Sequence, residues 1–204
     1  SDFFEALFGS MGGAPGGQRA HRTWTQTPRR GQDIEHEVEI TLEEAYRGAV
    51  RVLSIDGKRL EASIPPGVRT GSRVRLRGQG GAGSAGAASG DLFLRIAVQE
   101  HPRFERRGND LHTEVPVDLY TALLGGTVSV GGLGGELRLS IPALTQNGRS
   151  FRLRGRGMPA LRNPEQHGDL YARVRVVLPQ SLTDRERGLV EQLADLQAAP
   201  AGAE

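Results

Sequence analysis

Three glycines in the segment RVRLRGQGGAG (residues 73–83) have a spacing that can support chemistry. Gly78, Gly80 and Gly83 form GxGxxG, the pattern that lets a backbone approach the pyrophosphate of a dinucleotide. That chemistry needs a strand before the first glycine and a helix beginning at the last, because the phosphates sit at the helix N-terminus. A strand pattern does precede Gly78, but the chain after Gly83 runs through small residues directly into another strand pattern, DLFLRIAV. The sequence therefore argues against a dinucleotide site, and we expect no cofactor.

The glycine pattern belongs to an internal repeat. The segment GQDIEHEVEITLEEAYRG from Gly31 matches GNDLHTEVPVDLYTALLG from Gly108, which begins 77 positions later. IPPGVRTGSRVRLRGQG then matches IPALTQNGRSFRLRGRG, and GDLFLRIAV matches GDLYARVRV. The second copy repeats the surrounding pattern without the GxGxxG spacing, which favours a shared structural element over a cofactor loop.

The repeat divides the chain into four stretches. We expect a flexible linker over residues 1–30, a first module over 31–107, a second module over 108–179, and a C-terminal helix with a frayed tail over 180–204. The first stretch has too few apolar residues between its glycines to form a core. Each module can bury only a modest core, so it must depend on a few well-patterned strands.

Alternating apolar and polar residues predict β structure in both modules. The run IEHEVEI is predicted to be a half-buried strand, with His36 as the one polar residue on its apolar face. Thr41 and Glu44 then form a capping box for a short helical turn, which Gly48 ends. Asp118 and Gly125 occupy the corresponding positions in the second module.

A hairpin is expected next. Asp56-Gly57 separates VRVLSI from RLEASI, and both turn residues tolerate a positive φ. The predicted fold class is therefore mainly β, with two tandem homologous β-sandwich-like modules, short helical turns and a C-terminal helix.

Composition narrows the classes of function. The chain has 204 residues and no cysteine, which excludes thiolate metal sites and disulfides. Its histidines show no ligand spacing, so we expect no metal site; they are His21, His36, His101, His112 and His167. No apolar run reaches the roughly 18 residues that span a membrane, and no signal peptide is evident. We expect a cytoplasmic protein that has no membrane partner.

Charge is nearly balanced, with 26 basic and 24 acidic residues, and Lys58 is the one lysine. The arginines alternate along strand patterns such as RVRLR and FRLRGR, which is typical of solvent-facing positions. A nucleic-acid-binding protein usually gathers its basic side chains into one dense patch. DNA binding is therefore the less favoured alternative, and it stays open.

The order of sequence blocks resembles the C-terminal region of DnaJ-type co-chaperones. The blocks are EVEITLEEAYRG, IPPGVRTGSRVRLRGQG, GDLFLRIAVQEHPRFERRGNDL, VPVDLYTALLGG and LRGRGMPALRNPEQHGDLYARVRVVLP. The leading DFFEALFG resembles the end of the family's Gly/Phe-rich linker. The sequence has neither the His-Pro-Asp loop of a J domain nor repeated CxxC zinc pairs. It is thus similar to the zinc-free class, which includes a variant that binds curved DNA.

The resemblance implies a co-chaperone and not an enzyme. Such proteins hold unfolded or non-native polypeptides for transfer to a DnaK-type ATP-dependent chaperone. In the family, an extended peptide adds alongside the second strand of the first module, with its apolar side chains in a shallow groove. The matching positions here are Val38, Ile40, Leu53, Ile55 and Ile96. On the residues alone, each is as compatible with a core as with a groove. Arg51 matches a basic position that pairs with the acidic tail of the partner chaperone.

The C-terminal segment predicts an amphipathic helix. Leu189, Val190, Leu193 and Leu196 lie near one helical face. From spacing alone, this face can pack on its own module or on a second subunit. The resemblance favours a homodimer, in which two arms hold one client together. The second module, with the glycine-rich VGGLGGE in place of IDGKR, is expected to act mainly as a spacer.

Overall fold

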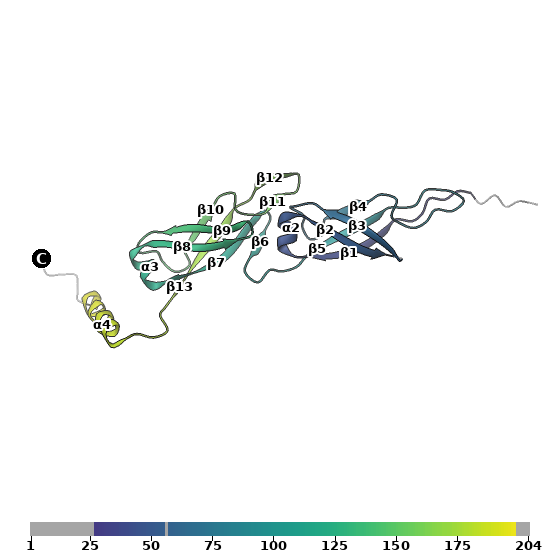
Figure 1. Cartoon of the computed structure of the whole chain (residues 1–204). Coiled ribbons are helices and arrows are strands. Elements are labelled where there is room, and N and C mark those ends of the chain that lie inside the picture. Colours follow the sequence, from purple (N-terminus) through teal and green to yellow (C-terminus); the bar gives the residue numbers. More distant parts are fainter. Residues whose placement is uncertain (1–26, 56, 199–204) are drawn as a thin grey trace, which may run out of the picture.

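The computed structural model describes residues 27–55 and 57–198, which form two β modules in a row followed by a helix (Figure 1). Most of the predicted linker lies outside the described residues. Its last residues contact the first module: Arg29 forms a β-bridge with Ser84, and Arg30 Nη2 donates to Asp91 Oδ2 at 2.9 Å. The end of the predicted linker is thus attached to the first module.

The first module consists of a three-stranded sheet, a hairpin and a short helix. Its elements are β1 (Ile34–Ile40), α2 (Leu42–Arg47), β2 (Ala49–Ile55), β3 (Lys58–Ile64), β4 (Arg73–Leu76) and β5 (Leu92–Val98). The sheet has the order β1-β5-β4, and β2 pairs with β3 as a separate hairpin. The central strand β5 runs parallel to β1 and antiparallel to β4.

The second module repeats this plan. Its elements are β6 (Glu105–Arg107), β7 (Asp110–Asp118), α3 (Leu119–Leu124), β8 (Gly126–Gly132), β9 (Gly135–Ile141), β10 (Ser150–Leu153), β11 (Pro159–Ala160), β12 (Asn163–His167) and β13 (Leu170–Val177). Here the parallel pair is β7 and β13, the hairpin is β8 and β9, and β11 with β12 forms an added small hairpin. Strand β6 is hydrogen-bonded to β7, so the second sheet includes residues that the repeat places in the first module.

Local sequence signals set these elements. The capping box before α2 is confirmed, because Thr41 Oγ1 accepts from Glu44 N at 3.3 Å and Glu44 Oε2 accepts from Thr41 N at 2.9 Å. Gly48 ends the helix at φ 77°. Asp118 caps α3, and Gly125 ends it at φ 83°. These matching helix ends fix how the chain turns from the sheet into the hairpin in each module.

The predicted hairpin is also confirmed. Ile55 pairs with Lys58 at its tip, and Gly57 has φ 76°; the neighbouring Asp56 lies outside the described residues. The hairpin of each module lies over its sheet in Figure 1.

Aliphatic side chains form the core of each module. In the first module the buried strand residues are Val38, Ile40, Ala62, Ile64, Leu92, Leu94 and Ile96. In the second they are Leu111, Val115, Val117, Val130, Leu139, Ile141, Leu170, Ala172 and Val174. Buried residues alternate with exposed ones along most strands, as two packed β layers require. The predicted mainly β fold with two β-sandwich-like modules and a C-terminal helix is confirmed.

The two modules meet through contacts at the end of α2 and along the connection between them. The rings of Tyr46 and His167 lie 5.6 Å apart, centroid to centroid. Gly67 packs so closely on the β11–β12 hairpin that a Cβ atom there would lie 2.7 Å from the carbonyl oxygen of Pro159. Arg106 Nη1 donates to the carbonyl oxygen of Val68 at 2.6 Å. These contacts join residues that the sequence repeat does not align.

The last element is α4 (Asp184–Ala198), which lies beyond the second module in Figure 1. Thr183 caps it, because its Oγ1 accepts from Glu186 N at 3.2 Å and Glu186 Oε2 accepts from Thr183 N at 2.7 Å. No side chain of α4 is buried. The helix therefore does not pack on its own module, which was one of the two possibilities that the spacing left open.

Candidate functional site

The hairpin of the first module has a free strand edge. Strand β2 pairs with β3 from Ala49 opposite Ile64 to Ile55 opposite Lys58, and among the described residues it pairs with no other strand. An edge strand presents unpaired backbone N–H and C=O groups that can pair with another chain. This edge can therefore accept an extended peptide as an added strand.

Aliphatic side chains flank this edge on both faces of β2. On the outer face Val50 and Val52 are 59% and 64% exposed. On the inner face Leu53 and Ile55 are half-buried and pack against the core of the module. A peptide strand added here would have apolar neighbours on either side.

Three of the predicted groove residues lie in the core. Val38, Ile40 and Ile96 are 6%, 1% and 0% exposed, and Val38 is opposite Ile96 in the parallel β1–β5 pair. In this structure they support the hairpin and present no surface to a ligand. Leu53 and Ile55 are the accessible part of the predicted set, and the peptide-binding role of all five stays a prediction.

The predicted basic position, Arg51, is paired within the module. Its Nη2 atom donates to Glu44 Oε2 at 2.7 Å. The N–H of Thr41 and then Arg51 lower the pKa of Glu44, against the opposing effect of burial. Arg51 Nε is buried and has no acceptor among the described residues. An acidic partner at Arg51 would compete with an internal carboxylate for the same guanidinium.

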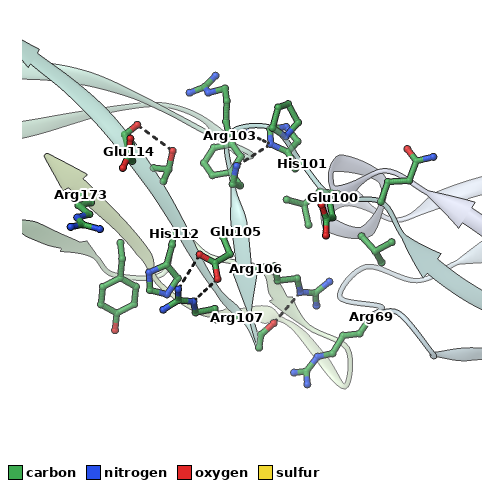
Figure 2. A pocket seen from close by; sticks show the side chains of 18 of the residues that line it. Arg69, Glu100, His101, Arg103, Glu105, Arg106, Arg107, His112, Glu114 and Arg173 are labelled. Carbon is green, nitrogen blue, oxygen red and sulfur yellow. Dashed lines mark hydrogen bonds and ion pairs between the residues drawn. The ribbon is translucent and has the colours of Figure 1, made fainter. Parts of the chain in front are cut away.

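A cleft between the modules carries charged residues that sequence reasoning did not single out. Its cavity volume is about 1130 Å³, and it is lined by the end of β5, the connection through residues 99–108, and strands β7 and β13 (Figure 2). Arg69, Arg106 and Arg173 lie in this lining. Because the arginines of this chain are spread evenly along the sequence, only the three-dimensional arrangement brings these three to one cleft.

The GxGxxG segment is a structural loop. Gly78 N donates to Asp91 Oδ1 at 2.7 Å, and the twin Gly155 N donates to Asp169 Oδ1 at 2.8 Å. The segment after Gly83 leads into β5 and forms no helix, as predicted. Both modules thus use the first glycine to bind a carboxylate of their own.

The predicted dimer helix presents its apolar face to solvent. Leu189, Val190, Leu193 and Leu196 are 58%, 43%, 51% and 75% exposed. Their role in dimerisation stays a prediction.

Residues 34–179 match the family model described as DnaJ C terminal domain, which covers both modules. The chain belongs to this family. The resemblance identified from the sequence blocks is thereby confirmed, and the free edge of β2 is an edge of a DnaJ C-terminal domain.

Similar proteins include chaperones and a DNA-binding protein. The chain is 41% identical to "Chaperone protein DnaJ" of Deinococcus proteolyticus over 196 residues, covering 96% of this chain and 58% of that protein. It is 39% identical to "Chaperone protein DnaJ 2" of Thermus thermophilus, covering 98% of this chain and 67% of that protein. It is 36% identical to "Curved DNA-binding protein" of Coxiella burnetii, covering 96% of this chain and 64% of that protein. The chain thus spans about three fifths to two thirds of the length of these relatives.

Two kinds of feature are absent from residues 27–55 and 57–198 of this DnaJ C-terminal domain. No group of three or more His, Asp or Glu side chains there is arranged to hold a metal ion. No helix in this part of the chain is both long enough and apolar enough to cross a membrane.

Proposed function

We propose that this chain is the client-holding part of a co-chaperone. An extended segment of an unfolded polypeptide adds to the free edge of β2 and is later transferred to a DnaK-type chaperone. Membership of the DnaJ C-terminal domain family supports this role, and two of the similar proteins are named as DnaJ chaperones. The observation that carries the proposal is the free β2 edge with Val50 and Val52 exposed beside it.

The chemistry of this edge suits a generic client. Backbone hydrogen bonds between strands do not depend on the sequence of the added peptide, so many clients can bind in the same way. The aliphatic neighbours Val50, Val52, Leu53 and Ile55 favour apolar side chains without a deep pocket for one particular residue. Non-native polypeptides expose apolar segments of this kind.

Weak binding at each edge is compensated when two copies act together. We propose that α4 joins two chains into a homodimer through its exposed apolar face. A client held by one arm then meets the second arm at a high effective concentration. A shallow edge on each arm is then sufficient for client holding.

The test is a titration of the chain with a fluorescently labelled, permanently unfolded protein. Leu53→Ala removes a half-buried aliphatic side chain beside the edge and should weaken client binding by about fivefold. Its matched control is Leu137→Ala on β9, because Leu137 is also half-buried and packs against the core of the second module. We expect both variants to lose similar stability and only the first to lose client affinity.

A second variant separates binding from folding. Val52 is exposed, so Val52→Lys leaves the core intact and should still reduce client affinity by up to about fivefold. If Leu53→Ala and Val52→Lys both bind the client as tightly as the unmodified chain, the β2 edge is not the client site.

DNA binding stays the less favoured alternative. Seven arginines of the described residues already pair with carboxylates of the chain, namely Arg30, Arg51, Arg73, Arg75, Arg107, Arg152 and Arg175. Such pairs leave less unneutralised charge for phosphates than a basic stripe would. A steep fall of DNA affinity with salt would be its signature.

A further inference from the structure

The cleft between the modules contains positive charge that the chain does not neutralise. Among the described residues, Arg69, Arg106 and Arg173 have no carboxylate within 4.0 Å. Two of the three glutamates in the lining already pair with arginines, since Glu105 pairs with Arg107 at 2.8 Å and Glu114 lies 3.6 Å from Arg175. The third, Glu100, has no basic partner among the described residues, so unpaired arginines outnumber unpaired acids in the cleft. The cleft therefore presents guanidinium groups that are not paired with a carboxylate.

Arg106 is the least solvated of these charges. Its guanidinium donates to three carbonyl oxygens, those of Val68 at 2.6 Å, Gly108 at 3.0 Å and Gly67 at 3.1 Å. Burial and then the charge of Arg69 lower the pKa of Arg106 to about 10, so the group is still charged at neutral pH. Carbonyl oxygens satisfy the directional hydrogen bonds of the guanidinium but supply no opposite net charge. An anion entering the cleft would therefore be stabilised by two neighbouring guanidinium groups.

The charges are distributed over the length of the cleft. Figure 2 shows Arg69 and Arg106 near one end and Arg173 near the other, with the Glu105–Arg107 pair and His112 between them. Arg69 Nη2 donates to Asn109 Oδ1 at 2.8 Å, which holds its guanidinium at the mouth of the cleft. A cavity of about 1130 Å³ exceeds the size of a typical small-molecule pocket and can hold several residues of a peptide.

We propose that this cleft binds an acidic segment of a partner polypeptide in an extended conformation. One carboxylate lies between Arg69 and Arg106, and a second, several residues away, pairs with Arg173. The proposal rests on the proposed function for the source of the segment, because a co-chaperone must also contact the chaperone that receives its client. It places this contact away from the β2 edge, so client and partner can be bound together.

The cleft is better suited to an acidic segment than Arg51 is. Arg51 already pairs with Glu44 at 2.7 Å, and Glu44 also accepts the N–H of Thr41 at the start of α2. A carboxylate that binds Arg51 must displace this internal acid. A carboxylate that binds Arg69, Arg106 or Arg173 displaces no internal acid.

The same cleft is poorly suited to nucleic acid. Glu100, Glu105 and Glu114 lie in its lining and would repel a backbone that carries a charge at every nucleotide. The aromatic rings of His112 and Tyr171 stack on each other at 4.9 Å and 9°, so those faces are not free to stack on bases. A peptide can place neutral residues opposite the glutamates and carboxylates opposite the arginines.

The experiment measures binding of a fluorescein-labelled peptide of alternating glutamate and glycine by anisotropy. The unmodified chain is compared with Arg69→Glu/Arg173→Glu and with a control, Arg156→Glu/Arg162→Glu. All four arginines are exposed, the two doubles change the net charge equally, and the control residues lie outside the cleft lining. We expect affinity to fall about tenfold or more for the cleft variant and to change by less than about twofold for the control. A glutamine–glycine peptide should bind weakly to all three.

Several results would overturn the proposal. The first is that the unmodified chain does not bind the glutamate–glycine peptide. The second is that both double variants lose the same peptide affinity. The third is that Arg51→Glu loses peptide affinity while the cleft variant does not. Specific loss of duplex DNA binding in the cleft variant, with peptide binding unchanged, would assign the cleft to nucleic acid instead. Arg69→Gln/Arg173→Gln provides a milder test if the glutamate double does not fold.

The same variants separate this proposal from the client-holding role. Titration with the labelled unfolded protein should be unchanged in the cleft variant, because its two substitutions lie away from β2. If the unmodified chain binds the acidic peptide but no unfolded protein, the client role fails and the cleft proposal stands.

Discussion

At the residue scale, a pair of aspartates closes the same loop in each module. Asp91 Oδ2 accepts from Arg75 Nε at 2.9 Å, and Asp91 N donates to Asp33 Oδ1 at 2.7 Å. In the second module Asp169 N donates to Asp110 Oδ1 at 2.8 Å. Asp91, which is buried, thus joins the end of β4 to the start of β5. Asp169, which is partly buried, joins the end of β10 to the start of β13 in the same way.

Replacing Asp91 tests the contribution of this carboxylate to stability. The N–H of Gly78, followed by Arg75, lowers the pKa of Asp91, although burial opposes them. A folded-state pKa below the unfolded value means stabilisation that is present above about pH 4 and lost as the pH falls through the folded pKa. Asp91→Asn should therefore lower the melting temperature by a few degrees at pH 7, with the difference shrinking in acid. Thermal unfolding followed by circular dichroism at several pH values measures this.

The control for that prediction is Glu37→Gln, since Glu37 is exposed on β1 and has no side-chain partner among the described residues. Its melting curve should follow that of the unmodified chain at every pH. If the decrease in melting temperature of Asp91→Asn stays constant down to pH 2, the ionised carboxylate does not stabilise the fold. Some acid sensitivity should persist in Asp91→Asn, because the N–H of Gly155 and then Arg152 also lower the pKa of Asp169.

The sequence alone explained part of this arrangement. The repeat correctly argued that Gly78 belongs to a structural loop, because its twin Gly155 lacks the GxGxxG context. It could not reveal that each glycine binds an aspartate, since Gly78 and Asp91 are 13 positions apart and meet only after β4 and β5 pair.

At the element scale, hairpins and caps were predictable because each is set by neighbouring residues. The parallel pairing of β1 with β5 was not, since alternation identifies a strand but not its partner. The same limit affects the predicted groove. Val38 and Ile40 alternate with glutamates, whereas Ile96 lies between Arg95 and Ala97 in a mostly apolar strand. Such patterns indicate that a face of a strand is covered, but they do not identify the element that covers it. In this structure the hairpin covers them.

The capping box before α2 gives a prediction at this scale. Thr41→Ala removes the hydroxyl that accepts from Glu44 N, leaving a helix N–H without its side-chain acceptor. Stability of the chain should fall by about 1 kcal/mol, measured by urea unfolding. Ser54→Ala is the control, because Ser54 is exposed on β2 and makes no side-chain hydrogen bond among the described residues. If both variants lose the same free energy of unfolding, the side-chain cap makes no specific contribution to stability.

At the scale of the whole molecule, the sequence predicted two modules but not how they meet. The repeat aligns equivalent residues, whereas the contacts between modules come from residues without an equivalent role in the other copy. Arg106 binds the carbonyl oxygens of Gly67 and Val68, and Tyr46 packs near His167 of the added hairpin. These contacts create the cleft, so its arginines could be found only in the structure.

The exposed helix α4 leads to the last prediction. Its apolar side chains, 43% to 75% exposed, would leave water if two copies packed face to face. Leu189→Glu/Leu193→Glu should therefore convert a dimer to a monomer in sedimentation analysis, while the unfolding transition of the modules is unchanged because neither side chain is buried in its own chain. Apparent client affinity should fall along with dimerisation, since a single arm loses the high effective concentration of the second.

The matched control is Arg187→Gln/Ala198→Glu, which changes the charge of α4 by the same amount on the side opposite the leucines. This variant should remain dimeric and hold clients as the unmodified chain does. A monomeric unmodified chain, or equal dissociation of both variants, would exclude α4 as the dimer contact. If the leucine variant is monomeric yet binds clients with undiminished affinity, each arm acts alone, and the β2 edge must by itself supply the full affinity for the client.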